Sequence, residues 1–354
     1  MIVVIPTARE IRLDYLEPLI SAGCRFIIVD DSPGRIDLHH PQFDVYNHGD
    51  QDRDLGDLVQ AIPRGNGACR DYGFLIAWRE SDPGEVVVAL DDDCLVKEAD
   101  WASAAEAALS KSLRPHVCTR ERHWNVLDLY EEIPSGSYPR GFPYSARLGY
   151  ECSSFGEKSE SSPMFHLGLW QGIFDVNAID KLEGPDYRYP EARLREPSVV
   201  VPSGSLVSAC SMNMVFRREL IPAVYQLPMA VDVMSGWKID RYGDIWGGFI
   251  TKALMDHCGD EFAVGAPMIT HLKEGNSLRN VWQEHICHLV NDEFVALVDA
   301  FGETDLPRDV SYLELMALLA DHFGRAEGSP LLRGYLRHLT RCMDAWVSAL
   351  EKFI

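Results

Sequence analysis

The sequence predicts an α/β protein whose N-terminal part forms a doubly wound unit around a parallel sheet. Three short apolar runs, at 2–5, 26–29 and 86–90, are continuous and rich in β-branched residues, which is typical of strands buried on both faces of a sheet. Helical patterns separate the runs. This alternation indicates parallel strands joined by right-handed crossovers.

The helices of this unit are predicted from apolar residues that recur every three or four positions. The first stripe stops before Gly23, a residue that suits the end of a helix. The two stripes consist of Ile11, Tyr15, Leu16, Leu19 and Ile20, and of Ala68, Tyr72, Leu75 and Ile76. Ligands of such sheets bind beyond the carboxyl ends of the strands, so the polar residues after each run are the first candidates for a site.

The composition is that of a folded and strongly acidic protein. The chain has 354 residues, of which 46% are apolar, and 33 Lys and Arg against 54 Asp and Glu give a formal net charge of −21. Because this charge repels phosphate backbones and anionic membranes, we expect no nucleic-acid partner and no membrane insertion. The nine cysteines are scattered, the start does not resemble a signal peptide and no apolar run could span a bilayer. We therefore expect a soluble cytoplasmic protein.

Two later parts of the chain differ from this N-terminal pattern. Residues 130–163 are rich in Gly, Pro, Ser and Tyr, which predicts a long loop with a binding or lid function. Residues 291–354 carry helical apolar stripes, and we expect them to form a helical extension to a main domain at 1–290. The stripes pack either on the sheet or on a second copy of the chain, so a homo-oligomer is one expectation.

Three adjacent carboxylates, Asp91, Asp92 and Asp93, directly follow the third apolar run. Adjacent carboxylates repel one another, and a hard cation such as Mn²⁺ or Mg²⁺ would neutralise them. An isolated run of this kind is more often a solvated acidic turn. The position at the end of a buried strand favours a metal site, where the ion would bridge the two phosphates of a nucleotide sugar.

A second candidate element follows the apolar stretch at 262–269. A neutral His271 would complete the coordination of Mn²⁺ together with carboxylates. Lys273, two residues further on, would reach a phosphate oxygen. The alternative for His271 is an ordinary surface or capping histidine.

The long loop contains Arg140 and Arg147, flanked by glycine and aromatic residues. A guanidinium binds two phosphate oxygens at once, so this segment suits a diphosphate. Pairing with surface carboxylates explains the two arginines equally well from spacing alone.

Asp244 lies where a further apolar-periodic stretch begins, close to the expected N-terminus of a helix. It is therefore either a capping carboxylate or one that faces a sugar. The run Gly65-Asn66-Gly67 lacks the third glycine of a dinucleotide fingerprint, and we discard that interpretation. The histidines and cysteines near 257 and 285 match no usual zinc spacing.

Taken in order, a series of short segments resembles the reversibly glycosylated polypeptide family, the UDP-arabinopyranose mutases of plants and their microbial relatives. The segments extend over about residues 1–290, which is more specific than any single motif. They are IVVIPTAR at 2–9, ACR at 68–70, ALDDDC at 89–94, PRGFPYSAR at 139–147, HLGLW at 166–170, SACSMNMVFRREL at 208–220, RYGDIWGG at 241–248 and THLKEGN at 270–276.

The resemblance implies a single glycosyltransferase-A type domain, which is a Rossmann-like nucleotide-diphospho-sugar transferase fold, with Mn²⁺ and a UDP-sugar substrate. It also implies that Asp91 and Asp93 bind the metal together with His271. By the same resemblance, Arg140 is the arginine that is reversibly glycosylated and Arg147 is a second arginine associated with activity.

The remaining candidates are residues that we expect to bind the nucleotide. For those that follow the first two strands, the expectation rests on their position in the fold. They are Pro6, Thr7, Arg9, Asp30, Asp31, Arg70, Asp92 and Lys273. The chain departs from the plant pattern at Ser211, where the family has a glycine, at Gly243, where it has an aspartate, and at 174–177, which has one carboxylate fewer. We expect these positions to lie near the sugar and the acceptor.

The function implied is a UDP-sugar mutase that interconverts pyranose and furanose forms. The alternatives are a retaining glycosyltransferase that acts on an external acceptor and a UDP-sugar-binding scaffold without activity. A guanidinium is a poor nucleophile, so a covalent role for Arg140 requires a carboxylate nearby, for which Asp175 and Asp244 are the candidates. Without one, Arg140 would be a phosphate clamp.

Overall fold

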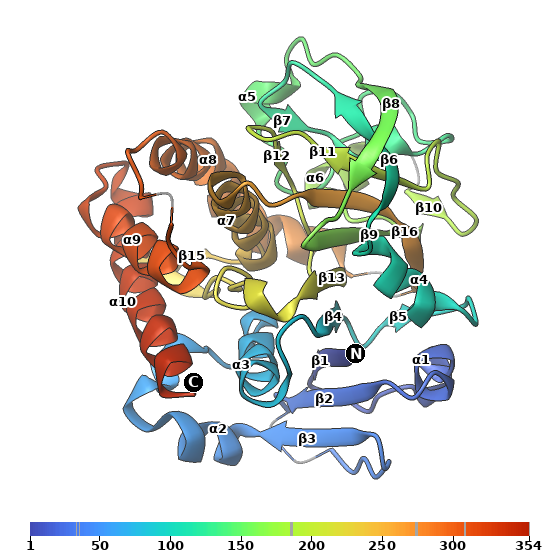
Figure 1. Cartoon of the computed structure of the whole chain (residues 1–354). Coiled ribbons are helices and arrows are strands. Elements are labelled where there is room, and N and C mark those ends of the chain that lie inside the picture. The colour runs from blue at the N-terminus through green and yellow to red at the C-terminus, as the bar shows by residue number, and fades with distance from the viewer. Residues whose placement is uncertain (33, 35, 185–186, 273–274, 308, 354) are drawn as a thin grey trace.

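The structure is a computed structural model of the whole chain, and it describes residues 1–32, 34, 36–184, 187–272, 275–307 and 309–353. These residues form a 12-stranded mixed sheet with helices on both of its sides (Figure 1). The arrangement agrees with the expected Rossmann-like, glycosyltransferase-A type fold with helices at its C-terminal end.

The strands are β1 (Ile2–Thr7), β2 (Arg25–Asp30), β3 (Phe43–Asn47), β4 (Val86–Leu90), β5 (Cys94–Leu95), β6 (Ser112–Cys118), β7 (His123–Trp124), β8 (Ser154–Ser161), β9 (Phe165–Ile173), β10 (Arg188–Tyr189), β11 (Ser198–Val201), β12 (Leu206–Val207), β13 (Asn213–Arg217), β14 (Val231–Met234), β15 (Trp237–Ile239) and β16 (Phe262–His271). The helices are α1 (Glu17–Ser21), α2 (His48–Leu55), α3 (Arg70–Glu80), α4 (Trp101–Ala108), α5 (Tyr144–Arg147), α6 (Ala178–Glu183), α7 (Gly243–Cys258), α8 (Ser277–Gly302), α9 (Tyr312–Arg325) and α10 (Pro330–Lys352).

The parallel start predicted from the sequence is confirmed. The three apolar runs are β1, β2 and β4, and β1 lies parallel to both of the others. The first helical stripe forms a short 3₁₀ turn followed by α1, and Gly23 ends it with a φ of +77°. The second stripe forms α3. A Cβ on Gly73 of this helix would lie 2.4 Å from Val4 Cγ1, so the glycine lets α3 pack closely on β1.

The order of the strands creates a switch point between β1 and β4. The sheet runs β3-β2-β1-β4-β13-β9-β16-β11-β6-β8, so that β2 and β3 lie on one side of β1 and β4 lies on the other. Beyond β4 the sheet becomes mixed, because β13 is antiparallel to β4 and to β9. In α/β sheets the crevice at such a switch point is where ligands bind.

The loop expected at 130–163 is only partly irregular. It contains α5 and the strand β8, which pairs with β6 at the edge of the sheet. The sequence of β8, SFGEKSES, has no apolar alternation because most of its side chains are solvent-exposed. An edge strand of this kind leaves no hydrophobic pattern to detect.

The apolar stripes of the C-terminal part pack against the same chain. Trp346 of α10 is fully buried, stacks on Tyr225 at 5.3 Å between ring centroids and donates a 3.1 Å hydrogen bond from Nε1 to the Pro222 carbonyl. Buried residues of α8, α9 and α10 join one hydrophobic core with those of the sheet. The stripes are therefore accounted for within one copy of the chain, and a homo-oligomer stays a prediction.

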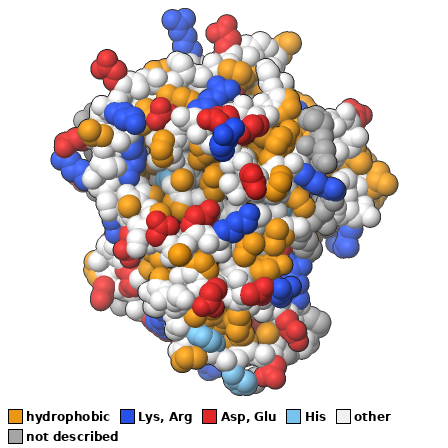
Figure 2. Space-filling view, turned by 90° about the vertical axis from the view of Figure 1, so that its right-hand side faces the viewer, with side chains coloured by type: hydrophobic (Ala, Val, Ile, Leu, Met, Phe, Trp, Pro, Cys, Tyr) orange, Lys and Arg blue, Asp and Glu red, His pale blue; other side chains and the backbone are white. Residues whose placement is uncertain are grey.

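The expected boundary between 290 and 291 falls inside α8, a continuous helix. The division into two domains likewise stays a prediction. No helix formed by the described residues is both long and apolar enough to cross a bilayer. Figure 2 shows acidic and basic side chains interspersed over one face of the molecule, rather than basic side chains gathered into a single patch.

We predict that Trp346→Ala lowers the free energy of unfolding of the whole chain by about 3–5 kcal/mol, because it leaves a cavity between α10 and the rest of the core. Equilibrium unfolding in urea measures this loss. The exposed neighbour Arg341 provides a control, since Arg341→Ala should change the stability by no more than about 0.5 kcal/mol. If the variant lost helical signal at low urea while the sheet unfolded at an unchanged urea concentration, α10 would not be part of the common core.

Candidate active site at the switch point of the sheet

The carboxyl ends of β1, β2 and β4 surround a cavity of about 560 Å³. One polar contact already joins two of these ends, because Thr7 Oγ1 donates a 2.6 Å hydrogen bond to Asp92 Oδ2. The sequence-predicted residues that line the cavity are Pro6, Thr7, Arg9, Asp31, Asp91, Asp92 and Asp93. The structure thus brings together residues that lie far apart in the sequence.

Arginines balance the three adjacent carboxylates of this cavity. Arg9 forms ion pairs with Asp92 and, at 3.0 Å, with Asp93 Oδ2, while Arg70 of α3 forms one with Asp91. Arg70 is 1% exposed, and its Nε and Nη1 atoms have no hydrogen-bond partner among the described residues. The sequence predicts neutralisation by a bound cation, whereas arginine side chains supply part of the positive charge.

The residues around Asp93 fit a divalent cation by their chemistry. His271, the last residue of β16, makes a 2.8 Å hydrogen bond from Nδ1 to the Ile173 carbonyl. A carbonyl only accepts, so Nδ1 carries a proton and Nε2 is the nitrogen available to a metal. That Nε2 lies 3.8 Å from Asp93 Oδ1. This distance is too long for a hydrogen bond, and an imidazole nitrogen and a carboxylate oxygen are both ligands of Mn²⁺.

This donor set is incomplete as it stands. No three His, Cys, Asp or Glu side chains within the described parts of the chain lie close enough together to hold an ion. Burial raises the pKa of Asp91, Arg70 opposes that shift and Asp93 adds to it. A cation here would need further oxygens from a substrate, as is usual for Mg²⁺ at phosphate sites. Lys273, expected to contact a phosphate, lies outside the described residues.

A second cavity of about 370 Å³ adjoins the first, and the walls of the two share Asp91 and Arg241. Its lining is rich in groups that bind hydroxyls, since amide, hydroxyl, carboxylate and guanidinium side chains all reach it. Those side chains belong to Arg70, Arg140, Ser211, Gln226, Asp240, Asp244 and Gln283. Two of the positions at which this sequence departs from the plant pattern, Ser211 and Gly243, line this second cavity.

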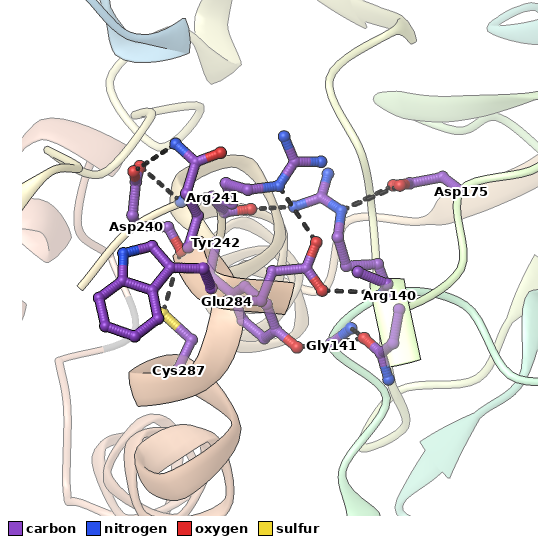
Figure 3. A network of polar contacts seen from close by, with 12 residues as sticks. Arg140, Gly141, Asp175, Asp240, Arg241, Tyr242, Glu284 and Cys287 are labelled. Atoms are coloured by element: carbon purple, nitrogen blue, oxygen red, sulfur yellow. Dashed lines mark hydrogen bonds and ion pairs between the residues drawn. The ribbon is translucent and has the colours of Figure 1, made fainter. Parts of the chain in front are cut away.

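Arg140 is the most strongly held side chain of the second cavity. It is 7% exposed, and its Nε donates to Asp175 Oδ1 at 2.9 Å, while Nη2 donates to Asp244 Oδ2 at 2.8 Å. Its Nη1 donates to Asp244 and to the Arg241 carbonyl. Figure 3 shows the guanidinium between Asp175 and Arg241. Both carboxylates proposed as partners of Arg140 therefore contact it.

The backbone fixes this position as well. The Arg140 N–H donates to the Asp175 carbonyl at 2.9 Å. The next residue, Gly141, has a φ of +79°, and a Cβ there would lie 2.3 Å from Ile245 Cγ2. Glycine is therefore required at 141 both for its backbone conformation and for its close packing on α7.

The two carboxylates keep Arg140 charged. Burial by itself lowers the pKa of this guanidinium, but attraction and hydrogen bonding by Asp175 and Asp244 outweigh burial and raise the pKa well above its ordinary value. For Asp175, burial raises the pKa, yet the Arg140 charge and hydrogen bonds lower it overall. A covalent role for Arg140 thus requires that a proton move to one of these carboxylates.

Asp244 is not a helix cap. The residue before α7 is Tyr242, and no side chain caps this helix terminus. Instead, both oxygens of Asp244 accept hydrogen bonds from Arg140, and Oδ2 also accepts one from the Ser211 N–H at 3.3 Å. Asp244 therefore pairs with Arg140 rather than capping α7, and its expected position facing a sugar stays a prediction.

Two predicted site residues have other partners. Arg147 pairs with Asp180 at 3.0 Å, lies 4.2 Å from the ring centroid of Tyr144 and lines neither cavity. The buried Asp30 accepts hydrogen bonds from the Ser32 N–H at 3.0 Å and from the Ile36 N–H at 2.8 Å. Its carboxylate thus shapes the loop after β2, and roles for both residues in the reaction stay predictions.

Sequence reasoning missed several residues that line the cavities. The run Gly65-Asn66-Gly67, which we discarded as a dinucleotide motif, lines both of them, and the Gly65 N–H donates to Asp31 Oδ2 at 2.7 Å. The signal available in the sequence was the position of this run in the loop before the second predicted helix, where a ligand-binding loop is expected. Gln226 and Gln283 gave no such signal, because each is a single polar residue with no motif around it.

Comparison with known proteins agrees with this geometry. A model of the family described as "Reversibly glycosylated polypeptide" matches residues 1–353. A protein of Solanum tuberosum named "Probable UDP-arabinopyranose mutase 2" is 28% identical over 99% of this chain and 89% of its own length. "UDP-arabinopyranose mutase 1" of Arabidopsis thaliana is 29% identical over 99% of this chain and 92% of its own length. With a family match along its entire length and a site at the expected place in the sheet, this chain belongs to the reversibly glycosylated polypeptide family.

Proposed function

We propose that this protein is a UDP-sugar mutase that interconverts the pyranose and furanose forms of a sugar, as the names of its UDP-arabinopyranose mutase relatives suggest. The observation that carries the proposal is the pair of adjoining cavities, which meet at Asp91 and Arg241. One lies at the strand ends, where α/β folds bind nucleotides. The other holds Arg140 between two carboxylates. The nucleotide would occupy the first cavity and its sugar the second.

The first cavity would bind the nucleotide. Pro6, Thr7 and Asp31 line it at the ends of β1 and β2 and would contact uridine. Arg9, which lines this cavity, and Arg70, which lines the second one beside Asp91, each have guanidinium nitrogens beyond those that bind the aspartates. Such nitrogens suit phosphate oxygens.

We propose Mn²⁺ or Mg²⁺ as the cofactor, held by Asp93 and His271 with Asp91 nearby. A divalent ion bound there would supply positive charge to the diphosphate of the substrate. The chain itself orients this site, because the Ile173 carbonyl fixes the His271 ring and Arg9 holds the other oxygen of Asp93.

The second cavity would carry out the ring rearrangement. In the covalent version, an Nη lone pair of Arg140 bonds to the anomeric carbon while the bond from that carbon to the UDP oxygen breaks. UDP leaves with the electron pair, and Asp244 accepts the Nη proton. The remaining lone pair on this nitrogen then forms a C=N bond to the anomeric carbon as the ring C–O bond breaks. A different hydroxyl oxygen bonds to that carbon while the C=N pair returns to nitrogen, and one proton passes from this hydroxyl to the former ring oxygen. Return of UDP reverses the first step.

A second candidate function, retaining transfer to an external acceptor, is favoured by one observation. A third hollow of about 450 Å³ shares Ala230, Asp240 and Gln283 with the second cavity, and the exposed Trp282 lines it. An aromatic face beside a sugar site is a common support for a second sugar ring. The two functions differ in their products.

The cytoplasm is the compartment that we propose. All nine cysteines lie in the described part of the chain, and each is a free thiol. Thiols of this kind persist in reducing compartments.

The first prediction concerns the products. Incubation with a UDP-pentose and Mn²⁺ should yield an isomeric nucleotide sugar with the same mass and no net release of UDP. Anion-exchange chromatography separates the isomers and free UDP. Accumulation of UDP in proportion to a glycosylated acceptor would instead identify a transferase.

The second prediction concerns the metal. Removal of divalent ions by a chelator should weaken UDP binding at least about tenfold, or ~1.4 kcal/mol, in isothermal titration calorimetry. Asp93→Asn should abolish most of the increase in UDP affinity that Mn²⁺ gives. Asp321→Asn in α9 makes the same chemical change at an exposed site and should retain that gain. Equal affinity with and without metal in the unmodified protein would refute the cofactor proposal.

The third prediction concerns Arg140. Arg140→Ala should lower turnover by about a hundredfold or more while UDP affinity changes far less, because the residue acts at the sugar. Since this change leaves Asp175 and Asp244 without their partner, thermal unfolding should be measured alongside. Arg140→Lys restores the charge without the planar guanidinium and should fold normally yet remain slow. Equal losses of affinity and turnover would make Arg140 a phosphate-binding residue.

A further inference from the structure

Arg241 lines both cavities, and nothing described above gives it a role in the reaction. It lies in the loop before α7 with a φ of +66°. A side chain other than glycine in this region costs free energy and persists only where the surrounding structure holds it there, often at functional sites. The position is therefore held in place against the local preference of the backbone.

A buried carboxylate anchors the inner end of the Arg241 side chain. Nε donates to Glu284 Oε1 at 3.1 Å, and Glu284 of α8 is 1% exposed. The other oxygen of Glu284 accepts the Ala178 N–H at 2.9 Å. Glu284 is thus fixed on both sides, and it in turn fixes the direction of the guanidinium.

The outer end of Arg241 has no such partner. Within the described ranges of the chain its two Nη groups have no hydrogen-bond partner, and the side chain is 35% exposed. Arg9, Arg70 and Arg140 differ, because each binds an aspartate of the cavities through an Nη atom. A guanidinium held at Nε with both Nη groups open matches the geometry of two phosphate oxygens.

The backbone of the same residue contacts the sugar cavity, since the Arg241 carbonyl accepts a hydrogen bond from Arg140 Nη1. One residue therefore contacts the arginine of the second cavity through its backbone carbonyl and lines both cavities. Figure 3 shows its side chain directed to Glu284. The boundary between a nucleoside site and a sugar site is where a diphosphate lies.

We propose that Arg241, anchored by Glu284, binds the diphosphate of the nucleotide sugar. This inference rests on the proposed function. It assigns the diphosphate to a part of the chain that the sequence motif of three aspartates does not include, and it makes α8 a support of the phosphate site.

The test compares UDP with uridine in the full-length protein with Mn²⁺. Arg241→Gln should weaken UDP binding about tenfold or more in calorimetry, because it removes a charged contact to phosphate. Binding of uridine, followed by NMR, should change by less than about twofold, since uridine carries no phosphate. Arg241→Lys keeps the charge without the two-pronged geometry and should recover part of the UDP affinity. All three residues at this position carry a side chain, so the backbone cost at 241 is similar in each.

Arg325→Gln makes the same change at an exposed arginine of α9 and should bind both ligands as the unmodified protein does. Unchanged UDP affinity in Arg241→Gln would overturn the inference. Equal weakening of UDP and uridine would also overturn it, because Arg241 would then support the shape of the cavity and not the diphosphate. Failure of the unmodified protein to bind UDP at all would refute the proposed function itself and the inference with it.

Discussion

Charge balance between arginine and aspartate is the constraint on which the whole cleft depends. The chain carries a net charge of −21, yet arginines are concentrated where its aspartates crowd together at the strand ends. Arg9, Arg70 and Arg140 each pair with an aspartate of the cavities. For the buried Arg140, removing the partner of such a pair costs about 3–5 kcal/mol. The result is a site that can receive an anionic substrate inside an otherwise repulsive protein.

The pairing of Arg140 with two carboxylates has two opposite chemical consequences. It holds the guanidinium charged and fixed in one direction, which suits stabilisation of negative charge. It also places a proton acceptor in contact with each end of the guanidinium, and without such an acceptor no arginine could act as a nucleophile. The two carboxylates thus keep the proton on Arg140, which opposes a covalent step, and they are also the groups that could accept that proton.

The C-terminal helices take part in building the site. Asn291 of α8 donates a 2.9 Å hydrogen bond from Nδ2 to the Gly141 carbonyl, next to Arg140, and its Oδ1 accepts from Trp246 Nε1 at 2.8 Å. Glu284 of the same helix holds Arg241. Asn291 is the first residue of the segment predicted as a helical extension, and it supports the loop that carries Arg140.

The sequence by itself determined the parallel start of the sheet, α3 and the acidic end of β4, because these features are encoded by local periodicity and by residues adjacent in the chain. It also determined which side chains were candidates, including Arg140, Asp175 and Asp244. Only the tertiary structure decided the mixed second half of the sheet, the polar edge strand β8 and the pairing of each arginine. Arg140 and Asp244 are 104 residues apart, and a contact of that range depends on how the whole core packs, which local patterns do not encode.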